Sequence, residues 1–230
     1  MQKYRHIFFD LDRTLYDFDR NNRETIYQLY CDFGLAEMGV ADFDTFHKTY
    51  KSINLPLWER YKKQEITKKY LNVARFSDTL KAFGINHGLA EKFASEYIRL
   101  SPMQVHLLPG TKELLDYLFP KYPLHIITNG FDEIQFLKIS RCGLEKYFQH
   151  VIVSEDAGAQ KPDPRIFDYA FEKTGALPKE SLLVGDDPQS DIFGAQQAGM
   201  DQVWLAQPGE TSAYEPTYQI GQLKELMDFL

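Results

Sequence analysis

The stretch that decides the fold is His6-Ile7-Phe8-Phe9-Asp10-Leu11-Asp12-Arg13-Thr14, close to the start of the chain. The apolar run Tyr4 to Phe9 predicts a buried strand, and two carboxylates follow it. Carboxylates at the end of a buried strand are desolvated on one side, so they need a metal ion, a cation or backbone N–H groups as partners. The pair is either a polar turn that ends a strand or part of a functional site. A calcium loop is excluded, because Leu15 stands where the glycine belongs and Asn21 where the bidentate glutamate belongs.

Further strands of the same kind are predicted downstream, with segments of helical periodicity between them. The predicted strands are Leu124–Thr128, Val151–Ser154, Ser181–Gly185 and Gln202–Leu205, and the predicted helices are Asp132–Cys142, Pro164–Thr174 and Gln189–Ala198. In the first of these helices we expect Ile134, Leu137 and Ile139 on one apolar stripe, with Phe136 on or beside it. Nearly continuous apolar strands separated by helices predict an α/β fold, a doubly wound parallel sheet covered on both faces.

The alternation of strands and helices stops between residues 17 and 105. Helical patterns fill this segment at Asn22–Phe33, Phe43–Lys51, Thr67–Phe83 and Leu89–Leu100, with breaks expected at Gly34, Gly39, Pro56, Gly84 and Gly88. We therefore expect residues 17–105 to form an all-α cap domain inserted after the first strand, and residues 1–16 and 106–230 to form the α/β core. An insertion at the carboxyl end of a strand lies over the ligand-binding edge of such a sheet, where it can act as a lid.

A second group of acids follows the predicted strand that ends at Gly185, in Asp186-Asp187-Pro188-Gln189-Ser190-Asp191. One interpretation is helix capping, with Asp187 or Ser190 as the N-cap. A single cap does not require three acids, however. If Asp186 and Asp191 lie beside Asp10 and Asp12, the shared negative charge requires a divalent cation, and a site of oxygen ligands favours Mg²⁺ over Zn²⁺.

Two further motifs lie between the acidic groups. Thr128-Asn129-Gly130 follows a strand and offers a hydroxyl and backbone N–H groups to a phosphate, or it is a simple tight turn. Lys161, before Pro162, is either a solvated lysine or a cation that neutralises both the carboxylates and a bound phosphate.

Taken together, these motifs resemble those of the haloacid dehalogenase superfamily, which match here as Asp10 to Thr14, Thr128, Lys161 and Gly185 to Asp191. The resemblance implies that Asp10 is the nucleophile and that Asp12 is the general acid and base. It also implies that Mg²⁺ is held by Asp10, the backbone carbonyl of Asp12 and Asp186. Thr128, Lys161 and backbone N–H groups near Leu11, Asn129 and Gly130 would hold the phosphate. Asp187 and Asp191 would fix the position of metal-bound water or of Lys161.

Asp12 favours a phosphatase within this superfamily, because an alkoxide leaving group needs a proton whereas a halide does not. A narrower similarity is to the house-cleaning pyrimidine nucleotidases. It is carried by Phe8 to Phe18, Asn54 to Trp58 followed by Ile66-Thr67, Ile127 to Phe131, and Lys161-Pro162 followed by Ile166 to Ala170. This similarity implies a Mg²⁺-dependent phosphoric monoester hydrolase acting on a nucleoside 5′-monophosphate. The expected substrate-binding residues are Leu11, Arg13, Thr14, Asn129, Gly130, Phe131 and Trp58. At Arg13 the usual pattern has glycine, and the arginine either contacts substrate or cap or simply faces solvent.

Other activities stay open at this point. A sugar-phosphate phosphatase or a phosphosugar mutase would share the core motifs. A phospho-accepting receiver domain also combines acids, Mg²⁺, a threonine and a lysine, but it needs neither a helical insertion nor the acid at Asp12.

Composition narrows the class of partner. The 230 residues carry a formal net charge of −7, which disfavours binding to a nucleic acid polymer. Two cysteines, no apparent leader segment and no long apolar stretch favour a cytoplasmic protein without a membrane partner. We expect a small phosphorylated metabolite as the ligand and a monomer or small homo-oligomer as the assembly.

Overall fold

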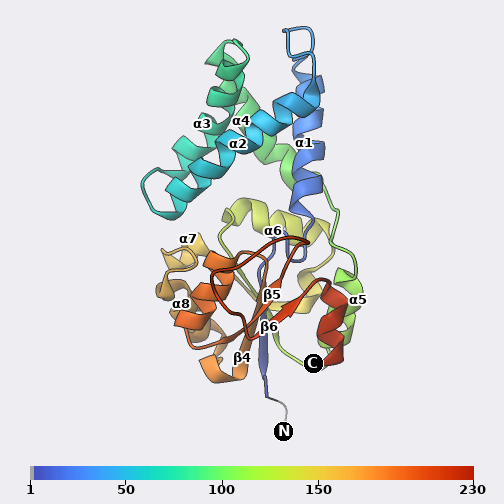
Figure 1. Ribbon diagram of the computed structural model, residues 1–230, viewed down its shortest axis with the longest axis vertical. Coiled ribbons are helices and arrows are strands. Elements are labelled where there is room, and N and C mark those ends of the chain that lie inside the picture. Colours follow the sequence, from blue (N-terminus) through green and yellow to red (C-terminus); the bar gives the residue numbers. More distant parts are fainter. Residues whose placement is uncertain (1–2) are drawn as a thin grey trace. The chain divides into compact units, whose positions relative to one another are not determined.

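The computed structural model describes residues 3–230 and divides the chain into two compact units, shown in Figure 1. One unit comprises Met1–Phe18 and Val105–Leu230, and the other comprises Asp19–Gln104. The first unit contains every strand of the described chain, and the second is helical.

The α/β unit is built on a six-stranded sheet in which all neighbouring strands are parallel. The strands are β1 (His6–Phe9), β2 (Leu124–Thr128), β3 (Phe148–Val153), β4 (Ser181–Gly185), β5 (Asp201–Leu205) and β6 (Tyr218–Ile220), in the order β3-β2-β1-β4-β5-β6. The predicted α/β fold is confirmed. The short β6 was not predicted, because three residues are too few to show a strand pattern.

The strand order places the motifs of the sequence beside one another. β1 lies between β2 and β4, and Phe9 is in register with both Ile126 and Val184. The chain winds outward through β2 and β3 on one side of β1 and through β4, β5 and β6 on the other. Such a reversal of strand order opens a crevice at the carboxyl ends of the central strands, where ligands bind in doubly wound folds.

Both faces of the sheet are covered by helices, because alternate residues of each strand point to opposite sides. Ile7 and Phe9 pack in one apolar cluster with residues of α5, α6 and η6, whereas Phe8 packs in another with residues of α8 and α9. The helices of this unit are α5 (Thr111–Leu118), α6 (Asp132–Arg141), α7 (Ser154–Ala157), α8 (Pro164–Thr174) and α9 (Gly194–Gln197). Short turns of helix occur at η3 (Glu145–Tyr147), η4 (Pro178–Glu180), the π-helical η5 (Pro188–Phe193) and η6 (Leu223–Asp228).

The apolar stripe predicted for α6 is wrong in part. Ile134 and Ile139 are buried as expected, but Phe136 and Leu137 are 48% and 43% exposed. Gln135 and Lys138 are the residues buried in their place, with 0% and 5% exposure. A polar group is buried at low cost only when it has a hydrogen-bonding partner, and both of these side chains have one at the edge of the sheet, described below.

The helical unit consists mainly of α1 (Phe18–Asp32), α2 (Phe43–Lys62), α3 (Lys68–Ala82) and α4 (Ala90–Leu100), with 3₁₀ turns η1 (His87–Leu89) and η2 (Ser101–Met103). Its core is rich in aromatic rings, including Phe46, Phe76 and Phe93. The helix break predicted at Pro56 is wrong, because α2 continues through this residue. A proline inside a helix removes one backbone hydrogen bond, and here it lies on an exposed part of the surface.

No helix within residues 3–230 is both long enough and apolar enough to cross a membrane.

A buried histidine in the central sheet gives the α/β unit a pH dependence. His125 of β2 is fully buried and lies between the rings of His6 and His150, with ring centroids 5.4 Å away on each side. Its Nε2 atom is 3.1 Å from Nδ1 of His6. Burial, together with these two neighbours, lowers the pKa of His125 to about 3.

We expect the contribution of His125 to the free energy of unfolding to fall as the pH is lowered from 7 to 5, whereas the raised pKa values of Asp10 and Asp186 act in the opposite direction. Below pH 6.5 the unfolded chain takes up a proton on the His125 ring, whereas the folded chain does not until about pH 3. This difference costs the folded state about 2 kcal/mol between pH 7 and pH 5. Urea denaturation at both pH values should show that the His125→Phe variant loses about this much less stability than the wild type. An equal loss in the two proteins would contradict the assignment.

Candidate active site

The loops that follow the central strands meet around the ammonium group of Lys161. This side chain is 1% exposed. Its Nζ atom donates hydrogen bonds to Asp10 Oδ1 at 2.7 Å and to Asp191 Oδ1 at 2.6 Å. A third hydrogen bond, 2.7 Å long, goes from Nζ to the main-chain oxygen of Ile127 in β2. Residues more than a hundred positions apart in the chain are therefore joined at one buried cation.

The acids at this point outnumber the cation. Asp10, Asp186 and Asp191 each offer a carboxylate oxygen, and these oxygens lie within 4.8 Å of one another. Burial raises the pKa of Asp10 to about 7; Lys161 opposes this rise, and the charge of Asp191 adds to it. Burial also raises the pKa of Asp186, with further contributions from Asp191 and Asp10, and the positive charge of Arg13 works against the rise.

The donor set fits a divalent cation. Three carboxylates and one ammonium carry a net charge of −2 when all are ionised, which one dication balances. All the side-chain donors are oxygen atoms, as Mg²⁺ prefers. Asp191 is the least available of the three, since its Oδ1 contacts Lys161 and its Oδ2 accepts from the backbone N–H of Asp187 at 3.0 Å.

The pKa of Lys161 follows the same charges. Burial alone lowers it, but Asp10 and Asp191 outweigh burial and hold it above its ordinary value. The ammonium therefore stays charged in the folded protein.

Local structure explains how Asp191 reaches this position. The Asp187 side chain caps the helical turn η5, with Oδ1 accepting from the backbone N–H groups of Gln189 at 2.9 Å and Ser190 at 3.0 Å. The capping alternative of the sequence analysis is therefore what the Asp187 carboxylate does here. Gly185 has no side chain to block Asp191, since a Cβ atom at Gly185 would overlap the Asp191 carboxylate.

Asn129 ties two loops of the site together. Its Nδ2 donates to the main-chain oxygen of Lys161 at 2.9 Å, and its Oδ1 accepts from the backbone N–H of Lys161 at 2.8 Å. The loop after β2 is thus fastened to the loop that carries Lys161. Asn129 therefore also fixes the main chain of the residue that carries the buried ammonium.

Asp12 has a separate set of partners, which the sequence analysis missed. Lys138 Nζ contacts Asp12 Oδ1 at 2.6 Å, and Gln135 Nε2 donates to Asp12 Oδ2 at 3.0 Å. Both partners come from α6. The available signal was that a lysine and a glutamine, three positions apart, occupy the face of a helix that packs on a sheet.

Thr128 ends β2 beside these groups and is 1% exposed. Its Oγ1 atom accepts from Gln135 Nε2 at 2.7 Å and from the backbone N–H of Gly130 at 3.1 Å. The hydroxyl of Thr128 is thereby linked to the carboxylate of Asp12 through one amide group.

The remaining residues of the first loop serve different purposes. Leu11 and Thr14 are fully buried, and the Thr14 hydroxyl makes no hydrogen bond within residues 3–230. Arg13 is exposed, and its guanidinium lies 4.7 Å from the centre of the Phe18 ring. Its backbone φ angle is +62°, in the left-handed region that glycine occupies most easily. The arginine therefore adopts the backbone conformation that suits the glycine it replaces.

Phe131 and Trp58 lie in different units. Phe131 is the N-cap residue of α6 in the α/β unit, and its ring is 3% exposed. Trp58 belongs to α2 in the helical unit, where it packs edge-on against Tyr61 with ring centroids 5.7 Å apart.

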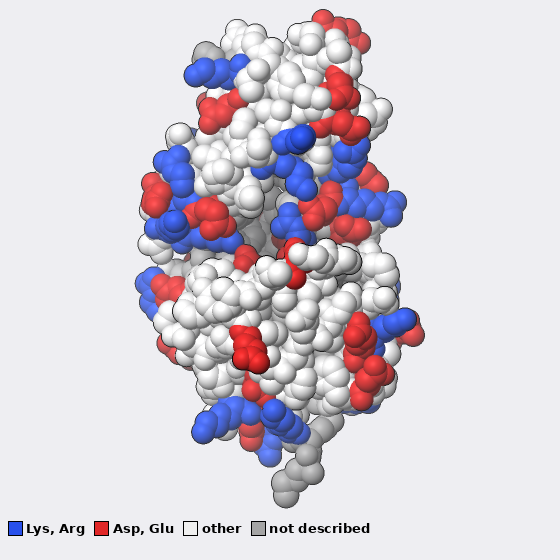
Figure 2. All heavy atoms as spheres, in the orientation of Figure 1, with Lys and Arg blue, Asp and Glu red and all other residues white. Residues whose placement is uncertain are grey.

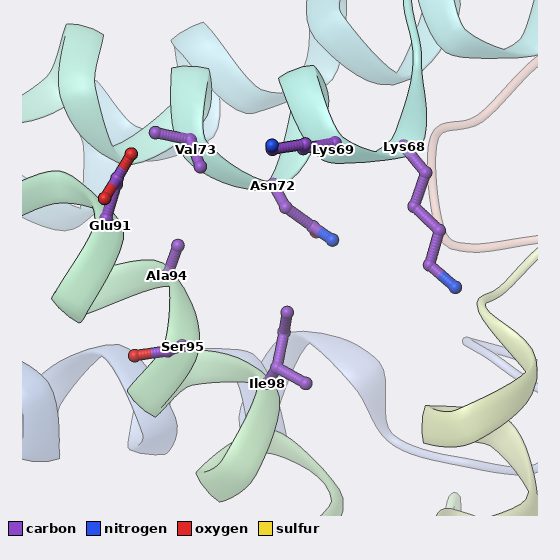
Figure 3. A pocket seen from close by; sticks show the side chains of 8 residues that line it. All are labelled: Lys68, Lys69, Asn72, Val73, Glu91, Ala94, Ser95 and Ile98. Atoms are coloured by element: carbon purple, nitrogen blue, oxygen red, sulfur yellow. The ribbon is translucent and has the colours of Figure 1, made fainter.

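The helical unit also contains a pocket of about 480 Å³ between α3 and α4, shown in Figure 3. Lys68, Lys69 and Asn72 line it from α3, and Ala94, Ser95 and Ile98 line it from α4. The sequence analysis did not single out any of these residues, and Trp58 is not among those that line the pocket.

The charged side chains show no segregation on the face seen in Figure 2, where acidic and basic groups are interspersed. The concentrated charge of the protein is instead the buried group around Lys161.

Known proteins resemble this chain over nearly its whole length. The family model "Haloacid dehalogenase-like hydrolase" matches residues 7–205, and the chain belongs to this family. The pyrimidine 5′-nucleotidase YjjG of Escherichia coli is 32% identical, over 99% of this chain and 98% of its own length. The pyrimidine 5′-nucleotidase PynA of Streptococcus pneumoniae is 33% identical, over 99% of this chain and 95% of its own length.

A solved structure extends the similarity to three dimensions. The HAD-hydrolase YfnB from Bacillus subtilis, determined with bound magnesium, has a TM-score of 0.88 and 31% identity, and the match covers 98% of both chains. The resemblance to the haloacid dehalogenase superfamily and to its pyrimidine nucleotidases is confirmed. The predicted enzyme class, a phosphoric monoester hydrolase, is confirmed with it.

We expect Gly185→Ala to destabilise the α/β unit and to displace Asp191 from Lys161. The added Cβ atom overlaps the Asp191 carboxylate, and overpacking of this kind costs about 1 to 3 kcal/mol. Gly221→Ala is the matched control, because the nearest atom to its Cβ is Glu225 Oε1 at 3.7 Å. Urea denaturation of both variants measures the effect. Equal stability of the two variants would show that the contact between Gly185 and Asp191 is not tight.

Proposed function

We propose that the protein is a Mg²⁺-dependent phosphatase that hydrolyses nucleoside 5′-monophosphates through an aspartyl-phosphate on Asp10. The observation that carries the proposal is the pair Asp10 and Asp12, which stand two residues apart but have different cations as partners. Asp10 is held by Lys161 next to the other acids, and Asp12 is held by Lys138 beside Thr128. Two carboxylates in separate environments suit two separate chemical roles.

Asp10 has the features of a nucleophile. Lys161 contacts its Oδ1, and its Oδ2 accepts no hydrogen bond within residues 3–230. In the first step a carboxylate oxygen of Asp10 forms a bond to phosphorus, and the bond between phosphorus and the ester oxygen breaks. Asp12 gives its proton to the departing oxygen, so the product leaves as an alcohol.

The second step releases phosphate. Asp12, now a carboxylate, takes a proton from water as the water oxygen attacks phosphorus, and the bond between phosphorus and Asp10 breaks. Inorganic phosphate is released, the Asp10 carboxylate is restored, and Asp12 is protonated again. The Thr128 hydroxyl and the Lys161 ammonium would stabilise the phosphoryl oxygens during both steps.

Asp10, the main-chain carbonyl of Asp12 and Asp186 would hold the metal ion. When bound, the ion supplies positive charge that offsets the negative charge of the nucleophile and of the phosphoryl group. Asp191 and Asp187 would act behind these groups, Asp191 by fixing Lys161 and Asp187 by capping the turn that positions Asp191.

The substrate assignment is supported by the two full-length nucleotidase relatives. A nucleoside 5′-monophosphate has a flat base, which Phe131 at the start of α6 would contact. Backbone N–H groups of Leu11 and Asn129, with Arg13 and Thr14 in the first loop and Gly130 beside Thr128, would surround the phosphate end.

Mg²⁺ should stabilise the folded protein, whereas Asp186→Asn should abolish this effect. Because the pKa of Asp186 is raised in the folded protein, its carboxyl ionises more readily in the unfolded chain, and this difference destabilises the folded state at neutral pH. Without metal at pH 7, the Asn variant should therefore melt at a higher temperature than the wild type. Glu133→Gln is the control, since it removes a carboxylate from the separate acidic group Asp132, Glu133 and Glu155. A Mg²⁺-dependent shift in melting temperature that survives in Asp186→Asn would contradict the metal assignment.

Activity against a panel of phosphate esters tests the chemistry and the substrate together. Asp10→Asn should reduce steady-state phosphate release below detection without loss of folding. Asp12→Asn should slow the hydrolysis of alkyl phosphates by about 100-fold or more, but that of p-nitrophenyl phosphate much less, because nitrophenolate leaves without a proton. Equal losses on both esters would exclude Asp12 as the acid, and turnover in Asp10→Asn would exclude it as the nucleophile.

The same panel separates the alternatives. Preference for pyrimidine monophosphates would support the proposed substrate. Preference for sugar phosphates would contradict it and leave the phosphatase chemistry intact. Isomerisation of a sugar phosphate with little phosphate release would indicate a mutase, and a single phosphorylation without turnover would indicate a receiver.

A further inference from the structure

Helix α6 contributes two buried polar side chains to the site, and both lie on its inner face. Lys138 and Gln135 are 5% and 0% exposed. A lysine or glutamine buried to this degree is stable only with well-placed partners. Their partners are Asp12 and Thr128, two residues to which the proposed function gives chemical roles.

Lys138 holds one oxygen of Asp12 and has no other carboxylate partner within residues 3–230. Its ammonium lies 2.6 Å from Asp12 Oδ1, 4.7 Å from the centre of the Tyr16 ring and 5.5 Å from that of Phe18. Both rings belong to the segment that follows β1, as Asp12 does. The cation is therefore enclosed by this segment, and aromatic faces stabilise a cation in such a position.

Gln135 holds the other oxygen of Asp12 and at the same time Thr128. Its Nε2 donates to Asp12 Oδ2 at 3.0 Å and to Thr128 Oγ1 at 2.7 Å, which uses both hydrogens of the amide. Its Oε1 is buried and accepts no hydrogen bond in the described part of the chain. The amide is thus committed as a donor to both residues.

This arrangement determines what the Thr128 hydroxyl can do. A hydroxyl has two acceptor positions and one hydrogen. Gln135 and the backbone N–H of Gly130 fill both acceptor positions of Thr128 Oγ1. The hydrogen is left to donate, and no acceptor for it occurs in residues 3–230. An anionic oxygen of a phosphoryl group is the acceptor that fits.

The glycine at position 130 is part of the same arrangement. A Cβ atom there would overlap the amide carbon and nitrogen of Gln135. Glycine therefore leaves room for the Gln135 side chain to pass beneath the loop and reach Thr128.

We propose that Lys138 and Gln135 are positioning residues: Lys138 fixes the Asp12 carboxylate for proton transfer, and Gln135 aligns the Thr128 hydroxyl as a donor to the phosphoryl group. The inference rests on the proposed function, and it assigns residues that act through Asp12 and Thr128 rather than on the substrate. Asp12 follows β1 and Thr128 ends β2, and one helix face sets the orientation of both.

Leaving-group dependence tests the role of Lys138. Lys138→Met keeps the length and apolar stem of the side chain and removes its charge. It should lower kcat for an alkyl phosphate by about tenfold or more and for p-nitrophenyl phosphate by about threefold or less, since only the alkyl ester depends strongly on the acid. Lys138→Arg should recover part of the alkyl phosphate rate. Arg141→Met, an exposed cation in the last turn of the same helix, is the control and should leave both rates within about twofold.

Phosphate affinity tests the role of Gln135 without turnover. Gln135→Met should weaken the binding of inorganic phosphate, measured by calorimetry with Mg²⁺, by about three- to tenfold, because the Thr128 hydroxyl is no longer held as a donor. Arg141→Met should bind phosphate as the wild type does. Unchanged phosphate affinity in Gln135→Met would overturn the assignment of this residue.

The outcomes separate this inference from the proposed function. Equal losses on both esters in Lys138→Met, or a faster alkyl phosphate reaction, would overturn the role of Lys138 while leaving the phosphatase in place. If the wild type cleaves both simple esters but no nucleotide, the proposed substrate fails and the ester comparison still decides the role of Lys138. If the wild type cleaves neither ester, the proposed function fails, and calorimetry still decides the role of Gln135.

Discussion

The structure of the site depends on one interaction, the contact of a buried ammonium with two buried carboxylates. Lys161 would be strongly destabilising alone in the interior, and so would Asp10 or Asp191. Together they satisfy one another at 2.6 and 2.7 Å, and the remaining donor position of the ammonium is filled by a main-chain oxygen of β2. The removal of Lys161 would leave two buried carboxylates without a cation, which makes this position hard to vary.

Several other features of the α/β unit make this contact possible. The order of strands brings the ends of β1, β2 and β4 together, so that residues from separate parts of the chain reach one cation. Asn129 fixes the backbone of Lys161, and Gly185 makes space for Asp191. Burial raises the pKa values of Asp10 and Asp186, and the charge of neighbouring acids adds to the rise. The net negative charge of such a site favours the binding of a cation.

Much of this arrangement was predictable from the sequence, for a clear reason. Apolar strands that end in acids, a threonine or a lysine place these groups at one edge of a parallel sheet, so Asp10, Asp186, Asp191 and Lys161 follow from pattern and topology. The partners of Asp12 did not follow. Helical periodicity assigns the buried face to apolar residues, and α6 instead buries Gln135 and Lys138 while exposing Phe136 and Leu137.

Predictions from local sequence were also wrong where the surrounding structure determines the backbone conformation. Pro56 does not end its helix, because the loss of one hydrogen bond at an exposed position is small beside the packing of the rest of α2. Arg13 takes a backbone conformation that the sequence would assign to glycine, and hydrogen bonding of its N–H to the main-chain oxygen of Tyr16 at 2.8 Å holds it there.

The hydrogen bonds of Asn129 to the main-chain oxygen and N–H of Lys161 hold two loops together as one rigid segment. Thr128 and Lys161 both belong to these joined loops or lie directly beside them, and all of these residues lie within the α/β unit. The sequence of the inserted helices can therefore change in evolution without altering the distance between the Thr128 hydroxyl and the Lys161 ammonium.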